Sequence, residues 1–273
     1  MGKEERLINF EKARPLGIGR LTACVHSTQK RKGLLIGSTK GLYHMSHPKS
    51  KVRRIRSWPV GYLLSGEDGV VCYEEAGGHG RIAVLDADLE ERMVDDGLAR
   101  EINPKAYACR GLLILHRDGI EHMDVSTLER RRLAEYEPCI TVGPFASVKG
   151  GYEFLAVHRG AHWPTWLYRL DIRGERCEEA VLSRIAQAED PIFPRVFLPL
   201  PTGDYFIVPQ GQSVFQTYRL FPGARPELKT WSLVAIPGDA HPVGIVLMDG
   251  KLCAAGADCL LIFRPGDELL RGS

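Results

Sequence analysis

The chain contains 273 residues, of which 44% are hydrophobic and 26% are charged. This balance is typical of a folded globular protein and excludes a disordered, collagen-like or coiled-coil chain. The 36 lysines and arginines nearly match the 34 aspartates and glutamates, which leaves a formal charge of +2. A polyanionic partner would therefore need a local basic patch, because the surface as a whole is not strongly basic.

The amino terminus is charged from its third residue and contains no apolar stretch of signal-peptide length. Because no run of 18 apolar residues follows it, we expect no membrane span and a cytoplasmic location. The seven cysteines are odd in number, contain no Cys-x-x-Cys pair and stand singly among apolar residues. We therefore predict buried free thiols rather than a disulfide framework.

A short apolar strand, a glycine-containing turn and a second alternating strand recur six times along the chain. The first copy reads GLLIGSTKGLYHM. β-Branched and aromatic residues on both sides of Gly, Asp-Gly or Gln-Gly predict a β-hairpin in each copy. The six predicted hairpins span residues 33–45, 69–87, 111–125, 152–172, 204–220 and 251–265.

A second element, consisting of a proline, any residue and then Gly, Ala or Val, precedes each hairpin at the start of another apolar strand. Proline suits this place because a strand start does not need the missing N–H. The spacing between these prolines is roughly 40 to 50 residues, the period of a four-stranded repeat. The six prolines are Pro15, Pro59, Pro104, Pro144, Pro194 and Pro242.

A further strand-like segment lies between most hairpins and the next proline, as in KVRRIRSW before Pro59. The last repeat lacks such a segment, but ERLINFEKAR, residues 5–14, stands in the equivalent place before Pro15. We therefore predict four strands in each repeat, with residues 5–14 completing the last sheet as its closing strand.

Six repeats of four antiparallel strands resemble the β-propeller superfamily over essentially the whole chain. The Gly-His and Trp-Asp signatures of WD repeats are absent, and kelch double glycines do not recur. The resemblance implies an all-β fold: one six-bladed propeller over residues 1–273, in which the amino-terminal strand completes the last blade. The blades are expected to start near residues 15, 59, 104, 144, 194 and 242.

In a propeller the innermost strands line a central channel, so residues beside the strand-start prolines are predicted to ring one of its mouths. These residues mix cations with aromatic rings and could hold an anionic or aromatic ligand. The alternative is that each is an ordinary loop residue. The predicted mouth residues are Arg14, Trp58, Asn103, Lys105, Phe193, Arg195 and His241.

Six-bladed propellers include calcium-dependent lactonases, whose family chemistry uses inward carboxylates and amides on a metal. Calcium takes six to eight oxygen ligands, whereas the predicted ring offers Asn103 and no carboxylate. The sequence also lacks a nucleophile elbow, a phosphate-binding glycine loop and a dinucleotide fingerprint. We therefore predict no catalytic residue, metal ligand or cofactor; a small-molecule hydrolase or lyase at the channel mouth is an alternative.

Basic clusters at residues 53–56 and 130–132 fall in predicted fourth strands, at the outer edges of two blades. Lysine and arginine commonly prevent such edges from pairing with other molecules, and we adopt this interpretation. The alternative is a binder of nucleic acid or another polyanion through these basic edge strands, which would show steep salt dependence.

The predicted function is a non-catalytic protein-interaction platform or an adaptor subunit of an intracellular complex. Its expected partner is another protein subunit, not a membrane or a nucleic acid. The longest insertions place large apolar side chains at turns, where they could act as binding hot spots. An alternative is that Trp166 is a buried strand residue and that only Trp163 reaches solvent. The predicted partner-binding residues are His162, Trp163, Trp166 and Phe221.

Overall fold

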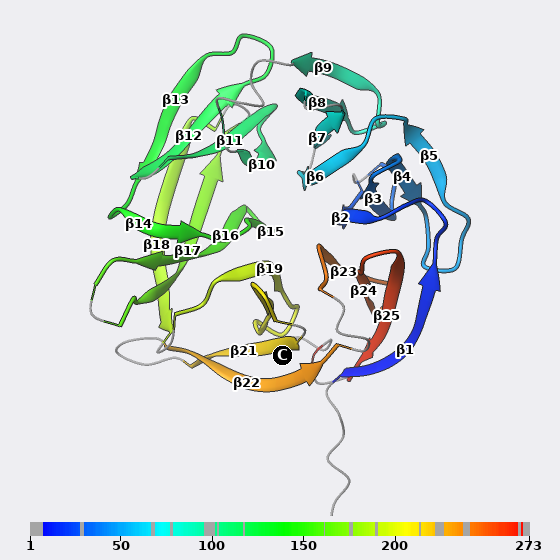
Figure 1. Ribbon diagram of the computed structural model, residues 1–273. Coiled ribbons are helices and arrows are strands. Elements are labelled where there is room, and N and C mark those ends of the chain that lie inside the picture. The colour runs from blue at the N-terminus through cyan, green and yellow to red at the C-terminus, as the bar shows by residue number, and fades with distance from the viewer. Residues whose placement is uncertain are drawn as a thin grey trace, which may run out of the picture.

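In the residues that the computed structural model describes, twenty-five β-strands form sheets around a central axis (Figure 1). The prediction of an all-β fold is confirmed, and four of the five sheets are four-stranded and antiparallel, as predicted. In the part of the chain that the structure describes, no helix is long and apolar enough to span a membrane. The described residues are 8–27, 30–66, 69–76, 79–95, 102, 104–116, 118–160, 162–174, 177–188, 191–212, 214–221, 227–236, 241–266 and 269.

Three sheets are four-stranded meanders, in which each strand pairs with the next along the chain. The first contains β2 (Leu21–His26), β3 (Leu34–Ser38), β4 (Gly41–Met45) and β5 (Arg53–Arg56). The second contains β6 (Val60–Ser65), β7 (Gly69–Ala76), β8 (His79–Asp86) and β9 (Glu91–Asp95). The third contains β10 (Pro104–Ala108), β11 (Gly111–His116), β12 (Gly119–Asp124) and β13 (Arg130–Glu135).

The largest sheet contains nine strands and divides into two meanders. The first meander consists of β14 (Cys139–Val142), β15 (Ala146–Val148), β16 (Gly151–His158), β17 (Thr165–Arg173) and β18 (Glu179–Ala188). The second consists of β19 (Pro194–Pro199), β20 (Tyr205–Pro209), β21 (Val214–Phe221) and β22 (Glu227–Ala235). The outer strands β18 and β22 join the two meanders through a short parallel pairing.

The remaining sheet brings together strands from the two ends of the described chain. It contains β23 (Ile245–Met248), β24 (Lys251–Ala255), β25 (Cys259–Pro265) and β1 (Ile8–Pro15). β1 pairs antiparallel with β25 along its whole length and lies beside it in Figure 1. Of the predicted closing strand, residues 5–7 lie outside the described residues.

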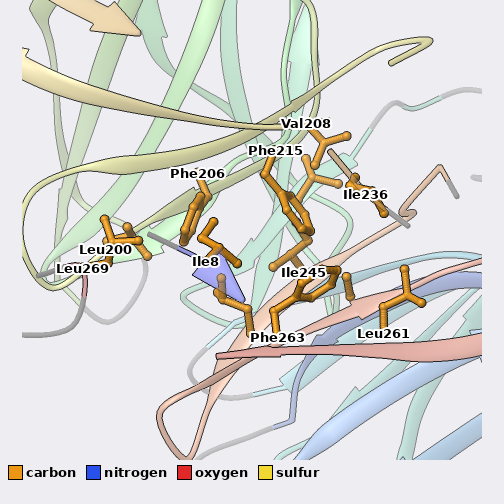
Figure 2. Packing of buried hydrophobic residues seen from close by; sticks show 13 residues of the cluster. Ile8, Leu200, Phe206, Val208, Phe215, Ile236, Ile245, Leu261, Phe263 and Leu269 are labelled. Atoms are coloured by element: carbon orange, nitrogen blue, oxygen red, sulfur yellow. The ribbon is translucent and has the colours of Figure 1, made fainter. Parts of the chain in front are cut away.

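Apolar side chains fill the spaces between neighbouring sheets, because successive residues of a strand point to opposite sides of its sheet. One such cluster lies between the β19–β22 meander and the sheet that contains β1 (Figure 2). In it, Ile8 packs among Phe206, Phe215 and Phe263, and all four side chains are almost fully buried. Ile8 thereby anchors the amino-terminal strand in a core built by the last third of the chain.

The seven cysteines are all free, and four of them are buried, including Cys24 and Cys72. Burial raises the pKa of both of these thiols, as expected for small core residues. Two cysteines from neighbouring sheets meet, although their sequence spacing does not indicate it. The Cys109 side chain, together with burial, raises the pKa of the Cys177 thiol, and the Cys109 thiol donates to the Gly174 carbonyl at 3.6 Å.

Candidate functional site

Four of the innermost strands share an irregularity next to their first residue. In β2, β6, β10 and β19 the pairing register shifts by one residue directly after the strand begins. Such a β-bulge leaves one residue without a ladder partner and re-aims its side chain. The residues at these bulges are Thr22, Gly61, Lys105 and Arg195.

The recurrent proline motif coincides with two of these bulges. Pro104 and Pro194 are the first residues of β10 and β19. Because proline has no N–H to donate, the ladder loses a bond at this position, and the regular pairing resumes at Ala106 and Val196. The middle residue of the motif is therefore the residue at the bulge.

The inner strands surround a central cavity of about 530 Å³, a volume within the range of small-molecule sites. β2, β6, β15, β19 and β23 contribute most of its lining, and Lys105 comes from β10. Among the described residues that line the cavity, none is Asp or Glu. A cavity with this charge favours anions. Its four basic lining residues are His26, Lys105, Lys149 and Arg195.

Lys105 lies between this cavity and a second one of about 470 Å³, which His116, Cys139 and Arg159 also line. Burial lowers the pKa of the Lys105 ammonium, because desolvation disfavours its charged form. Within the described residues, neither Lys105 nor Arg195 forms a side-chain hydrogen bond or ion pair. Both predicted mouth residues thus present unneutralised charge to the central cavity.

Arg14 was also predicted at the channel mouth, and this prediction is wrong. It lies on β1, the outermost strand of its sheet. Its guanidinium donates to the Pro48 carbonyl and, at 2.8 Å, to the Ser50 carbonyl, both in the turn between β4 and β5. The reason is that Pro15 ends an outer strand, whereas the next inner strand begins only at Leu21.

Trp58, another predicted mouth residue, directly precedes Pro59 and the inner strand β6, but it does not line the central cavity. Its half-buried ring instead contacts a cation of β8. The Arg81 guanidinium carbon lies 3.5 Å from the centroid of the Trp58 ring, a cation–π contact. The predicted mouth residue Asn103 lies outside the described residues.

Phe193 and His241, the remaining predicted mouth residues, are also absent from the lining of the central cavity. The ring centroid of Phe193 lies 6.2 Å from that of Trp163, in an edge-to-face arrangement. His241 is exposed, and its Nδ1 atom lies 3.4 Å from the Gln212 carbonyl oxygen. Phe193 therefore belongs with the predicted partner-binding residues rather than with the channel.

The turn between β16 and β17 displays two of the predicted partner-binding residues. His162 and Trp163 have φ angles of +65° and +50°, a left-handed conformation that is rare for a residue as bulky as tryptophan. The His158 N–H donates to the Pro164 carbonyl at 2.9 Å, and the Trp163 N–H donates to the Gly160 carbonyl at 3.3 Å. These bonds hold the turn, and Trp163 is 50% exposed.

Trp166 and Phe221 lie in one row across the nine-stranded sheet. Trp166 pairs with Gln187, Gln187 with Glu227, and Glu227 with Phe221. Directly opposed residues of a sheet point to the same side, so these four side chains share the side that faces away from the core between the two meanders. Three inter-strand spacings, about 14 Å, separate Trp166 from Phe221.

Trp166 is a strand residue that keeps part of its surface exposed. The Arg184 guanidinium carbon lies 5.0 Å from the centroid of its ring. Arg184 is itself held in place, since its Nε donates to the Tyr168 hydroxyl at 3.1 Å and it pairs with Glu137 at 2.9 Å. Phe221 is 45% exposed, so Trp163 is not alone in reaching solvent.

The predicted basic clusters lie on β5 and β13, the outer edges of their sheets. Several of their guanidinium groups have partners in the same or a neighbouring sheet. Arg56 pairs with Glu74 at 2.5 Å, and Arg132 pairs with Asp118 at 2.8 Å. Charges neutralised in this way contribute little attraction for a polyanion.

No three His, Cys, Asp or Glu side chains gather into a group that could hold a metal ion within the residues that the structure describes. One histidine pair of the sequence, His158 and His162, flanks the β16–β17 turn. His158 is buried, and its Nε2 atom lies 2.9 Å from the Tyr168 hydroxyl. The His158 ring is therefore part of the core, whereas His162 is exposed.

No protein-family model matches the chain, and no curated protein matches it. Solved structures do resemble it. A chain of the Mitotic Checkpoint Complex has a TM-score of 0.63 at 10% identity, with 97% of each chain covered. The luciferin-regenerating enzyme has a TM-score of 0.54 at 10% identity, with 96% of this chain and 97% of that chain covered.

The extracellular domain of a one component system from B. thetaiotaomicron has a TM-score of 0.51 at 9% identity, and the match covers 93% of this chain and 39% of that one. Structural neighbours of the chain are β-propeller proteins, so the chain has the β-propeller fold. Because these neighbours include an enzyme and a chain of a complex, the fold leaves the function to be argued from the surface.

Proposed function

We propose that the protein is a non-catalytic interaction platform, an adaptor subunit that binds another protein of an intracellular complex. Its framework is a single six-bladed propeller over residues 1–273, which the amino-terminal strand closes. Six units support six blades: the three separate meanders, the sheet that contains β1, and the two meanders of the nine-stranded sheet. The pairing of β1 with β25 supports the closure.

The observation that carries this proposal is the conformation of Trp163. A bulky aromatic side chain is held half-exposed on a left-handed backbone, at a cost in conformational energy that the turn's hydrogen bonds offset. Strain of this kind persists only where the surrounding structure holds it, so the turn presents the Trp163 ring in a fixed position. Exposed tryptophan on a rigid support is a typical binding hot spot, because little side-chain entropy is lost when it is buried.

The proposed contact surface extends from this turn onto the side of the nine-stranded sheet that faces away from the core between its two meanders. On this side Trp166 packs in part against the apolar cluster that the third sheet shares with β14–β18. It begins with His162 and with Trp163, whose ring makes an edge-to-face contact with the ring of Phe193. It continues through Trp166 to Phe221 along the row of paired residues. The fold is shared with a chain of the Mitotic Checkpoint Complex. By analogy, this surface would contact a neighbouring subunit of an assembly.

Truncation of Trp163 to alanine, combined with Phe221→Ala, is expected to remove the partner. Hot-spot side chains cost about 2 kcal/mol or more on truncation, so the affinity should fall by at least about 30-fold. The measurement is quantitative affinity capture of the intact protein from its own cells, followed by titration of the purified partner against both proteins.

Leu128→Ala is the matched control, because Leu128 is also a large apolar residue with a positive φ and an exposure of 46%. It lies in the turn between β12 and β13, in another sheet. The control variant should bind the partner like the wild type. A partner that binds the double variant and the wild type equally well would refute the contact surface, and recovery of the protein without any stoichiometric partner would refute the platform.

A further inference from the structure

We infer that the central cavity binds a small molecule through an oxyanion group, a phosphate or a carboxylate, held between Lys105 and Arg195. This inference concerns the inside of the ring and does not depend on the proposed partner surface. It follows from four features: the positions of the two cations, their lack of counter-charges, the basic lining of the cavity and the volume of the cavity.

The two cations stand at equivalent places in two sheets. Each is the residue at a bulge, one position after the proline that begins an inner strand. Inner strands that run in the same direction place these residues at the same end of the channel. The corresponding bulges of β2 and β6 carry Thr22 and Gly61, so the charge is confined to one part of the mouth, on the two sides of β15.

The two cations also lack counter-charges. Two other arginines of low exposure, Arg56 and Arg81, have a carboxylate partner in Glu74. Lys105 and Arg195 have none, and the cavity that they share has no acidic lining residue among those described. Lys105 is half-buried, and a partly desolvated cation without a partner destabilises a fold, so its presence is better explained by a ligand than by structure. Arg195 is exposed and lines the same cavity.

The chemistry of the two groups defines the ligand. Arginine offers a planar fork that matches a carboxylate or phosphate, and lysine adds a compact positive charge. Lys149 and His26 extend the basic character of the lining, and burial lowers the pKa of His26. A volume of about 530 Å³ admits a small metabolite but not a folded polymer.

The first test uses inorganic pyrophosphate and succinate as probes, titrated by calorimetry against the full chain at constant ionic strength. We expect at least one probe to bind with a stoichiometry of one. Lys105→Gln and Arg195→Gln should each weaken that binding by about 10-fold or more, the loss of one charge-assisted hydrogen bond. Lys12→Gln, which removes one positive charge from the exposed face of β1, should leave it unchanged.

The second test is thermal unfolding without a probe, at low salt. Because the two cations have no partners, Lys105→Gln and Arg195→Gln are expected to melt at the same temperature as the wild type or above it. The probe should raise the melting temperature of the wild type and not that of the double variant. Absence of binding by both probes, or equal affinity in the variants and the wild type, would overturn the inference.

Discussion

Deletion of residues 1–15, which removes β1, is expected to lower the melting temperature by about 10 °C or more. The loss of Ile8 alone empties a buried site among Phe206, Phe215 and Phe263, and such a loss costs about 2–5 kcal/mol. The hydrogen bonds of the β1–β25 ladder add to it. For a chain of this size each kcal/mol corresponds to about 2–4 °C.

The deletion also leaves β25 as a bare edge strand that carries large apolar residues, so aggregation is expected at protein concentrations that the full chain tolerates. Circular dichroism on heating and gel filtration measure the two effects. Deletion of residues 1–6 is the control, because it keeps all of β1. A synthetic peptide of residues 5–16 should restore part of the stability in trans. If the deleted protein melted like the full chain, β1 would not hold the ring closed.

Much of the architecture could be predicted because it is local. A hairpin is specified by alternating apolar residues on both sides of a turn, and the predicted hairpin 33–45 corresponds to β3 and β4. The proline motif also predicted where inner strands begin, since Pro104 and Pro194 are the first residues of two inner strands. The sequence therefore predicted Lys105 and Arg195, which follow these prolines, at the channel mouth, although it did not indicate the β-bulges at which they lie.

The remaining features depend on register and on pairing between distant segments, which composition does not encode. Arg14 was misplaced because the proline beside it ends a strand instead of beginning one. The row from Trp166 to Phe221 requires the parallel contact of β18 with β22, which involves two residues of each strand. Neither a bulge nor a contact this short changes the hydrophobic pattern by which strands are recognised.

A buried carboxylate connects the first two meanders at their outer parts. Glu74 on β7 is fully buried, and its oxygens lie 2.5 Å from Arg56 Nε and 2.7 Å from Arg81 Nε. Arg56 belongs to β5 of the neighbouring sheet and also pairs with the half-exposed Glu91 at 2.6 Å. Arg81 in turn packs over the Trp58 ring. Glu74 therefore compensates two largely buried guanidinium groups, of which Arg56 has a second carboxylate partner in Glu91.

Glu74→Gln is expected to destabilise the protein by about 3–5 kcal/mol, because breaking a buried ion pair leaves a desolvated charge uncompensated: Arg81 loses its carboxylate partner, and Arg56 keeps only Glu91. The melting temperature should fall by roughly 6–20 °C, at 2–4 °C for each kcal/mol. Glu91→Gln removes a carboxylate from the same Arg56, but its side chain is 52% exposed, so we expect a loss within about 1 kcal/mol. Urea unfolding of the two variants measures the difference. Equal stabilities would mean that water, rather than Glu74, compensates the two arginines, and that the contact between the first two sheets depends on their apolar cluster alone.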